Sequence, residues 1–176
     1  MNELFTTRSS CRLCDSKRIE LVVPLGCSPV SEKYVTKAQR SDDQDLVPID
    51  LYFCDECSHV QMIHAVNPDY LWSDFTFKTS DNPHLVAHFK DYVQRVCTQL
   101  TLNKLDLIVD VGSNDGTLLK CFHQKGFENL LGVDPAAEIA ETANNQGIPT
   151  NVGYMNREMA KRILKSKGQA RIITAN

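Results

Sequence analysis

Four of the seven cysteines fall into two matched pairs, each with two residues between the thiols. The first pair is Cys11 and Cys14 in CRLC, and the second is Cys54 and Cys57 in CDEC. A Cys-x-x-Cys turn places two thiolates on one side of a metal ion, and two such turns complete the tetrahedral shell that zinc prefers. The sequence therefore predicts a four-cysteine zinc site. Because four thiolates leave no open position, the zinc would be structural rather than catalytic.

Other interpretations of these cysteines stay open. The four could be unrelated buried thiols, or one pair could be a redox dithiol. The 39 residues between Cys14 and Cys54 exceed the spacing of a compact zinc ribbon, so the site must tolerate an inserted loop. His59 lies two residues after Cys57 and could compete as a ligand, although a position at the surface or outside the ligand shell is favoured. The other three cysteines have no partner at metal-ligand spacing.

A second set of residues that could bind a ligand lies in the stretch LIVDVGSNDGTLLK. A strand is expected to end at Val111 and a helix to begin near Gly116. Glycines in such a turn let the backbone pass close to a ligand, and the helix N-terminus offers free N–H groups. Asp134 follows Asp110 by 24 residues, at the end of the next expected strand, where a carboxylate can accept hydrogen bonds from ribose hydroxyls. The pattern indicates an adenosine-type ligand, and well-packed α/β turns are the alternative.

The cysteine pairs lie in a segment without helical periodicity. Residues 1–67 contain short β-like runs, IELVV and IDLYF, separated by turn residues, which predicts a small β-rich module. Residues 68–104 are expected to form a linker and a connecting helix. Apolar residues recur there at helical spacing, and Asp81 or Asn82 is the expected N-cap before Pro83.

The glycine-containing stretch lies in a segment with a different pattern. From residue 105 to 176, apolar strands alternate with helices that end at glycines. This alternation is typical of right-handed βαβ units around a parallel sheet. The predicted fold class is therefore α/β, with a β-rich four-cysteine zinc-binding module followed by the N-terminal part of a Rossmann-like parallel sheet.

Composition excludes several classes of function. The formal net charge of −3 provides no general basic field for nucleic acid. No apolar run approaches the roughly 20 residues that span a bilayer, and the N-terminus lacks the apolar core of a secretion signal. A cytoplasmic location without membrane partners is expected, where thiols stay reduced and are available to metals.

Five separated motifs resemble one group of class I methyltransferases that use S-adenosylmethionine. This group carries an N-terminal zinc-binding domain and C-methylates nucleotide-linked deoxy-ketosugars. The motifs are, in order, CRLC, PLGCSPVSEKY, CDECSHVQMI, SDFTFKTS, and VDVGSNDGTLLK with GVDPA. The resemblance covers nearly the whole chain. It implies a class I methyltransferase fold, structural zinc, and S-adenosylmethionine as cofactor.

The resemblance also implies a reaction and a set of contacts. In the parent enzyme, a base would remove a proton next to a ketone, and the resulting enolate would take up the methyl group. The cofactor contacts expected in this chain are Asp110, Gly112, Ser113, Asn114 and Asp134. No catalytic base is assigned, and the catalytic residues stay unknown.

Two departures from the family pattern matter. Phe75 and Phe77 stand where the family usually has tyrosines, so a phenol that could reach substrate or cofactor is absent. In the family, the strand ARIITAN continues into an Asn-Asn-x-x-x-His segment, further strands and a C-terminal domain that helps hold the sugar nucleotide. Here the sequence ends at Asn176. The expectation is an N-terminal fragment that is inactive alone and self-associates through an exposed sheet edge.

Three alternatives stay open beside this interpretation. The chain could be a non-catalytic, zinc-stapled interaction module on a degenerate α/β half-domain. It could also be a complete small domain that covers its sheet edge by dimerising. A nicotinamide-binding fragment is less favoured, because the glycine spacing differs from G-x-G-x-x-G. Cofactor binding and turnover by the full-length parent distinguish the methyltransferase from the interaction module, and the cofactor that competes separates the nicotinamide-binding fragment.

Overall fold

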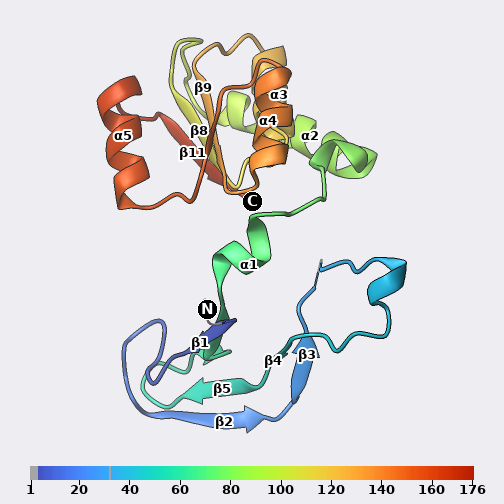
Figure 1. Ribbon diagram of the computed structural model, residues 1–176. Helices are drawn as coiled ribbons and strands as arrows, with labels where there is room; N and C mark the ends of the chain where they lie inside the picture. Colours follow the sequence, from blue (N-terminus) through green and yellow to red (C-terminus); the bar gives the residue numbers. More distant parts are fainter. Residues whose placement is uncertain (1–3, 32) are drawn as a thin grey trace. The chain divides into compact units, whose positions relative to one another are not determined.

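The computed structural model describes residues 4–31 and 33–176 (Figure 1). The chain divides into two compact units, residues 1–71 and residues 72–176. We call the first the cysteine module and the second the α/β unit. Within the described ranges, no helix is both long and apolar enough to cross a membrane.

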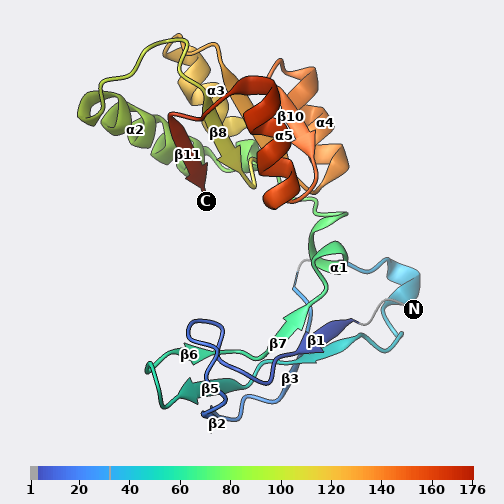
Figure 2. The same cartoon turned by 90° about the vertical axis from the view of Figure 1, so that its left-hand side faces the viewer.

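The cysteine module is built from short antiparallel strands (Figure 2). They are β1 (Phe5–Thr7), β2 (Ile19–Val23), β3 (Cys27–Pro29), β4 (Leu46–Pro48), β5 (Leu51–Cys54), β6 (Val60–Gln61) and β7 (His64–Val66). The central sheet has the order β2-β5-β6, while β1 pairs with β7 and β3 pairs with β4. A 3₁₀ turn, η1 (Lys37–Gln39), lies between β3 and β4, and α1 (Pro68–Trp72) follows β7. The β-rich character of this module is confirmed.

The cysteine module buries few apolar side chains. Among its described residues, the buried hydrophobic side chains are Cys11, Val47, Cys54 and Ile63. Two of these four belong to the predicted metal site. Strands this short cannot bury a continuous apolar face, so apolar packing contributes little to holding the module together.

The connecting helix begins where its capping signal predicts. After the 3₁₀ turn η2 (Thr79–Asp81), helix α2 runs over Pro83–Gln99. The side chain of Asn82 accepts hydrogen bonds from the N–H groups of His84 and Leu85, at 3.1 and 3.2 Å. This confirms the Asn82 N-cap, with Pro83 in the first helical turn, where its missing N–H is not needed.

The α/β unit contains four parallel strands in the order β10-β9-β8-β11. The strands are β8 (Ile108–Val111), β9 (Leu130–Asp134), β10 (Thr150–Val152) and β11 (Ile172–Ala175). The helices between them are α3 (Thr117–Gln124), α4 (Ala137–Asn145) and α5 (Arg157–Lys167). The expected alternation of strands and helices is confirmed, and the arrangement is that of a partial Rossmann-like sheet.

Apolar clusters cover both faces of this sheet. Figure 1 shows α5 on one side of the strands and α2, α3 and α4 on the other. Ile108 of β8 belongs to the cluster that includes Phe89 of α2 and Phe122 of α3. The next residue, Val109, belongs to the opposite cluster, which includes Ile163 of α5. Because successive strand residues point to opposite faces, β8 contributes to both halves of the core.

Strand β11 lies at one edge of the described sheet. Its register pairs Ile172 with Ile108 and Ala175 with Val111. The side chain of Ile173 is 67% exposed. Self-association through this edge stays a prediction.

Candidate functional site

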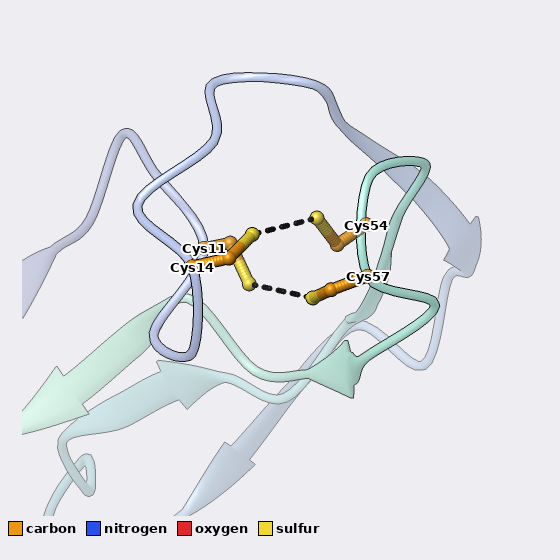
Figure 3. Close-up of side chains that lie close together, drawn as sticks. All are labelled: Cys11, Cys14, Cys54 and Cys57. Atoms are coloured by element: carbon orange, nitrogen blue, oxygen red, sulfur yellow. Dashed lines mark hydrogen bonds between the residues drawn. The ribbon is translucent and has the colours of Figure 1, made fainter.

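The four paired cysteines converge on one point (Figure 3). Their sulfur atoms all lie within 4.8 Å of one another. The Sγ atoms of Cys11 and Cys57 are 3.7 Å apart, as are those of Cys14 and Cys54. Four zinc–sulfur bonds of about 2.3 Å in a tetrahedron require sulfur–sulfur distances of about 3.8 Å, whereas a disulfide requires about 2.05 Å. The sulfur arrangement therefore fits a zinc ion.

Each cysteine pair is held by a loop of the same backbone geometry. In the first loop, the N–H of Cys11 donates to the carbonyl of Ser16 at 2.8 Å, and the N–H of Asp15 donates to the carbonyl of Cys11 at 3.1 Å. The second loop repeats these two bonds at 3.0 and 2.8 Å through Cys54, His59 and Ser58. The two loops are thus equivalent halves of one metal site.

The residue after the second cysteine of each pair adopts a left-handed conformation. Asp15 has φ 58° and Ser58 has φ 60°. Neither residue is a glycine, so each position carries a steric cost. Such conformations persist only where the surroundings impose them. Here the left-handed conformations are imposed by the hydrogen bonds that the two loops share and by the convergence of the sulfur atoms.

The thiols differ in their acidity. Burial is the main cause that raises the pKa of Cys57 to about 12; the neighbouring thiols add to the rise, and a backbone hydrogen bond from His59 opposes it. For Cys11, burial also acts to raise the pKa, but hydrogen bonds from the backbone of Cys14 and Leu13 outweigh it and lower the pKa to about 6. A bound metal must therefore displace the proton of Cys57.

His59 is not among the clustered metal-binding side chains. The group that the structure brings together consists of the four cysteines. His59 contributes its backbone carbonyl, which accepts the N–H of Cys54. This agrees with the favoured interpretation of His59 as a residue outside the ligand shell.

Gln61 supports the first loop, and sequence reasoning missed it. The side chain is 5% exposed, and its Oε1 accepts the backbone N–H of Arg12 at 2.8 Å. Arg12 lies between Cys11 and Cys14, so this bond ties the loop to strand β6. The Nε2 atom is buried without a hydrogen-bond partner among the described residues. A lone glutamine in a two-residue strand gives no sequence signal for this role.

The glycine turn, residues 112–116, uses its two glycines for different reasons. Both have positive φ values, 68° at Gly112 and 76° at Gly116. A Cβ at Gly116 would lie 3.0 Å from the side chain of Ile148, so this glycine permits close packing. A Cβ at Gly112 would meet only the carbonyl oxygen of Asn176, at 3.9 Å. The open side of the turn is therefore at Gly112, where a ligand could approach the backbone.

Asp134 ties the ends of two neighbouring strands together. Its Oδ2 accepts the N–H of Asn114 at 2.7 Å, and its Oδ1 accepts the N–H of Ala136 at 2.9 Å. The residue is 6% exposed. Each carboxylate oxygen has a second acceptor site, so both oxygens can also receive hydroxyl groups of a ligand.

Asp110 is buried at the end of β8, beside β11. Its Oδ1 accepts the hydroxyl of Thr174 at 2.6 Å, and the residue is 3% exposed. Burial is the main cause that raises the pKa of Asp110 to about 6; the Thr174 hydrogen bond opposes the rise, and the charge of Asp134 adds to it. Asp110 is thus poised to change its charge near neutral pH.

Ser113 carries a buried hydroxyl without a partner among the described residues. A Cβ at Gly132 would lie 2.4 Å from this Oγ, so a glycine at position 132 is required for Ser113 to fit. Sequence reasoning did not single out Gly132, although it precedes Asp134 in GVDPA by two positions. A buried hydroxyl without a partner is costly, and this one lies in the turn predicted to bind a ligand.

The glycine turn also binds a segment far away in the sequence. The amide of Asn114 accepts the N–H of Thr79 and donates to the carbonyl of Phe77, both at 2.9 Å. Asp115, which is 1% exposed, accepts the N–H of Ser80 at 3.0 Å. We call residues 77–80 the strap. The side chain of Asn114 is committed to the strap, and its predicted contact with a cofactor stays a prediction.

Comparisons with known proteins agree with this geometry. The model of a zinc binding domain family named after methyltransferases matches residues 11–72. The chain is 28% identical over 173 residues to the C-methyltransferase NovU of Streptomyces niveus. The match covers 98% of this chain and 41% of the relative, so the chain spans less than half of that protein's length. Together these matches support the zinc-binding C-methyltransferase family that the five motifs indicated.

Proposed function

We propose that this chain provides the zinc module and cofactor-binding residues of a C-methyltransferase that uses S-adenosylmethionine. The single observation that carries the proposal is the glycine turn, which is open at Gly112 and hydrogen-bonded to Asp134. The similarity to a C-methyltransferase supports it.

The residues of the turn suit an adenosine-type ligand with a cationic tail. The two oxygens of Asp134 would accept the ribose hydroxyls, since each retains an acceptor site. Gly112 would let the backbone approach the ligand, and the hydroxyl of Ser113 would gain a partner. Asp110, in its charged form, would attract the ammonium group of the methionine moiety. When bound, S-adenosylmethionine supplies an electrophilic methyl group.

The proposed substrate of the whole protein is a nucleotide-linked deoxy-ketosugar. The family resemblance supports this substrate class and attack by an enolate on the methyl group. No described residue is assigned as the base that forms the enolate. A cytoplasmic location and the absence of methyl transfer by this chain alone are parts of the same proposal.

The zinc ion would have a structural role. The four cysteines fill its coordination shell, so no position is left for substrate or water. The ion would join the two equivalent loops, whose module has few other buried apolar contacts. Its removal should therefore affect the fold of the module rather than a chemical step.

Titration calorimetry with S-adenosylhomocysteine tests the cofactor site. We expect saturable binding to the 176-residue chain and at least a tenfold loss of affinity in Asp134→Ala, because the ribose hydroxyls lose their acceptor. Glu141→Ala is the matched control: it removes an exposed carboxylate from α4, outside the turn. Thermal melts of each variant separate loss of binding from loss of fold.

Two results would contradict the proposal. Equal affinity of the parent chain and Asp134→Ala would remove Asp134 from the site. A folded chain with one zinc ion that binds neither S-adenosylmethionine nor its product would favour the non-catalytic interaction module instead.

A further inference from the structure

We infer that Asn114 and Asp115 are positioning residues that couple the strap to the occupancy of the cofactor site. They hold residues 77–80 against the glycine turn. When a ligand binds at Asp134, the strap and the aromatic residues next to it in the sequence therefore become more ordered. The ligand part of this inference rests on the proposed function, whereas the positioning part can be tested without a ligand.

Side chains of the glycine turn supply hydrogen-bond partners for three backbone groups of the strap. Its bonds to the turn join the backbone of Phe77, Thr79 and Ser80 to the side chains of Asn114 and Asp115. The bonded residues are 35 and 37 positions apart in the sequence. Hydrogen bonds of this kind fix a loop that has no sheet or long helix of its own.

Asn114 has a backbone conformation with a steric cost that glycine would avoid. It has φ 51°, a left-handed conformation that glycine adopts without steric cost and that asparagine tolerates better than most residues. Glycine would suit the backbone but would remove both bonds to the strap. The left-handed conformation and the two hydrogen bonds of the amide together indicate that Asn114 positions the strap.

Asp115 anchors the other end of the strap rigidly. Its Oδ1 accepts the hydroxyl of Thr117 at 2.7 Å, while its Oδ2 accepts the N–H of Ser80. Although burial acts to raise the pKa of Asp115, the hydrogen bonds from Ser80 and Thr117 outweigh it and keep the pKa below its usual value. The carboxylate therefore stays charged and bound to both partners.

One continuous path of hydrogen bonds joins the predicted ribose acceptor to the strap. Asp134 accepts the N–H of Asn114, and the amide of the same Asn114 binds Phe77 and Thr79. Hydroxyl groups bonded to the carboxylate of Asp134 would act on the residue that holds the strap. A ligand can thus change the order of the strap without touching it.

The strap continues into an aromatic row that contains a natural reporter. The rings of Phe77 and Phe75 are 6.5 Å apart at 63°, and those of Phe75 and Trp72 are 5.3 Å apart at 67°. Both are edge-to-face arrangements. Trp72 is the single tryptophan of the chain and is 42% exposed, so its emission reports on the order of this row.

The first experiment measures positioning without ligand. Backbone hydrogen exchange should show protection of the Thr79 and Ser80 N–H groups in the parent chain. Asn114→Gly keeps the left-handed backbone but removes the amide, and should increase exchange at Thr79 at least tenfold. Asn129→Gly is the matched control, because its amide bonds the carbonyl of Leu105, away from the strap. Unchanged exchange at Thr79 in Asn114→Gly, or an equal increase in the control, would overturn the positioning role.

The second experiment measures coupling to the ligand. S-adenosylhomocysteine is titrated while Trp72 emission and binding heat are followed on the same samples. We expect an emission change that saturates at the calorimetric Kd, and a response at least halved in Asn114→Gly and in Asp115→Asn but not in Asn129→Gly. Binding heat without an emission change would overturn the coupling. Absence of heat would instead refute the proposed function, while the exchange result would still decide the positioning role.

Discussion

The two units of this chain differ in the interactions that stabilise each of them internally. In the cysteine module, two of the four buried hydrophobic side chains are predicted metal ligands, Cys11 and Cys54. In the α/β unit, separate apolar clusters cover both faces of a parallel sheet. A hydrophobic core stabilises in proportion to the apolar area it buries, so the second unit can be stable by packing. We expect the first to need a bound metal in place of a larger apolar core.

The same difference appears in the exposed side chains of β2. Leu21, Val22 and Val23 are 49%, 43% and 40% exposed, although the run IELVV is as apolar as a core strand. Val109 of β8 is 2% exposed, because helices cover both faces of its sheet. Hydrophobic sequence alone therefore does not decide burial; the layers around a strand do.

The largest expected effect is loss of the metal site. Cys54→Ser removes a buried ligand at the end of β5, so we expect zinc content to fall from one ion per chain to near zero and the cysteine module to unfold. Structural zinc contributes about 10–16 kcal/mol in zinc-finger peptides. Metal analysis and limited proteolysis of residues 4–71 check this. One retained zinc ion with an intact module would show that Cys54 is not a ligand.

Phe122→Ala provides the reciprocal test. Phe122 is fully buried in the cluster of the α/β unit, and its truncation should cost about 3–5 kcal/mol of unfolding free energy in that unit. Zinc content should stay at one ion per chain. A loss of zinc in Phe122→Ala would mean that the two units do not have independent sources of stability.

A smaller effect concerns the pH dependence of the α/β unit. An unfolded aspartate has a pKa near 3.9, whereas burial raises the pKa of Asp110 in the folded chain to about 6. The folded state therefore keeps a proton between these pH values that the unfolded state releases. Stability falls as the pH rises through this window and levels off above it, by at most about 3 kcal/mol.

Asp110→Asn should remove this dependence, because the amide cannot ionise but its carbonyl can still accept the Thr174 hydroxyl. Between pH 5 and pH 8, the parent α/β unit should lose about 1 kcal/mol relative to Asp110→Asn. Urea unfolding, monitored by hydrogen exchange in residues 105–176, measures this difference in stability. Parallel pH profiles of the two proteins would contradict the assignment.

The smallest expected effect is in the metal loops. Ser58→Gly should stabilise the second loop by about 0.5–1 kcal/mol, since glycine adopts its left-handed conformation without strain. Ser58→Val should do the opposite, because a β-branched side chain is worse there. Competition with a zinc chelator measures both variants. Weaker zinc retention in the glycine variant would refute the strain argument.

Local patterns were sufficient to predict strands β2 and β5, helix α2, the strands and helices after residue 105, and the convergence of the cysteines. The Cys-x-x-Cys spacing and the Asn82 cap act over a few residues, and strand alternation reflects local burial. The bond between Thr174 and Asp110 spans 64 positions, and the bonds of the strap span about as many residues as a whole βαβ unit. Such contacts have no period in the sequence, so the roles of Asp115 and Gln61 could not be predicted.

The two glycines of the turn also show that a sequence pattern does not reveal which residues come into contact. Both fit the pattern of a ligand-binding turn, yet Gly116 packs against Ile148 and only Gly112 is open. The difference depends on which side chain a neighbouring element brings to each Cα. Sequence reasoning assigned Gly112 to the cofactor, and that role stays a prediction until a ligand is bound.

Residue-resolved hydrogen exchange of the whole chain, before and after zinc chelation, tests the contrast between the two units most directly. We predict that chelation increases exchange at the Cys54 and Ser58 N–H groups and throughout β5, while the N–H groups of β8 and β9 keep their protection. Unchanged protection in β5 after complete zinc removal would contradict it. So would an equal loss of protection in β5 and β8.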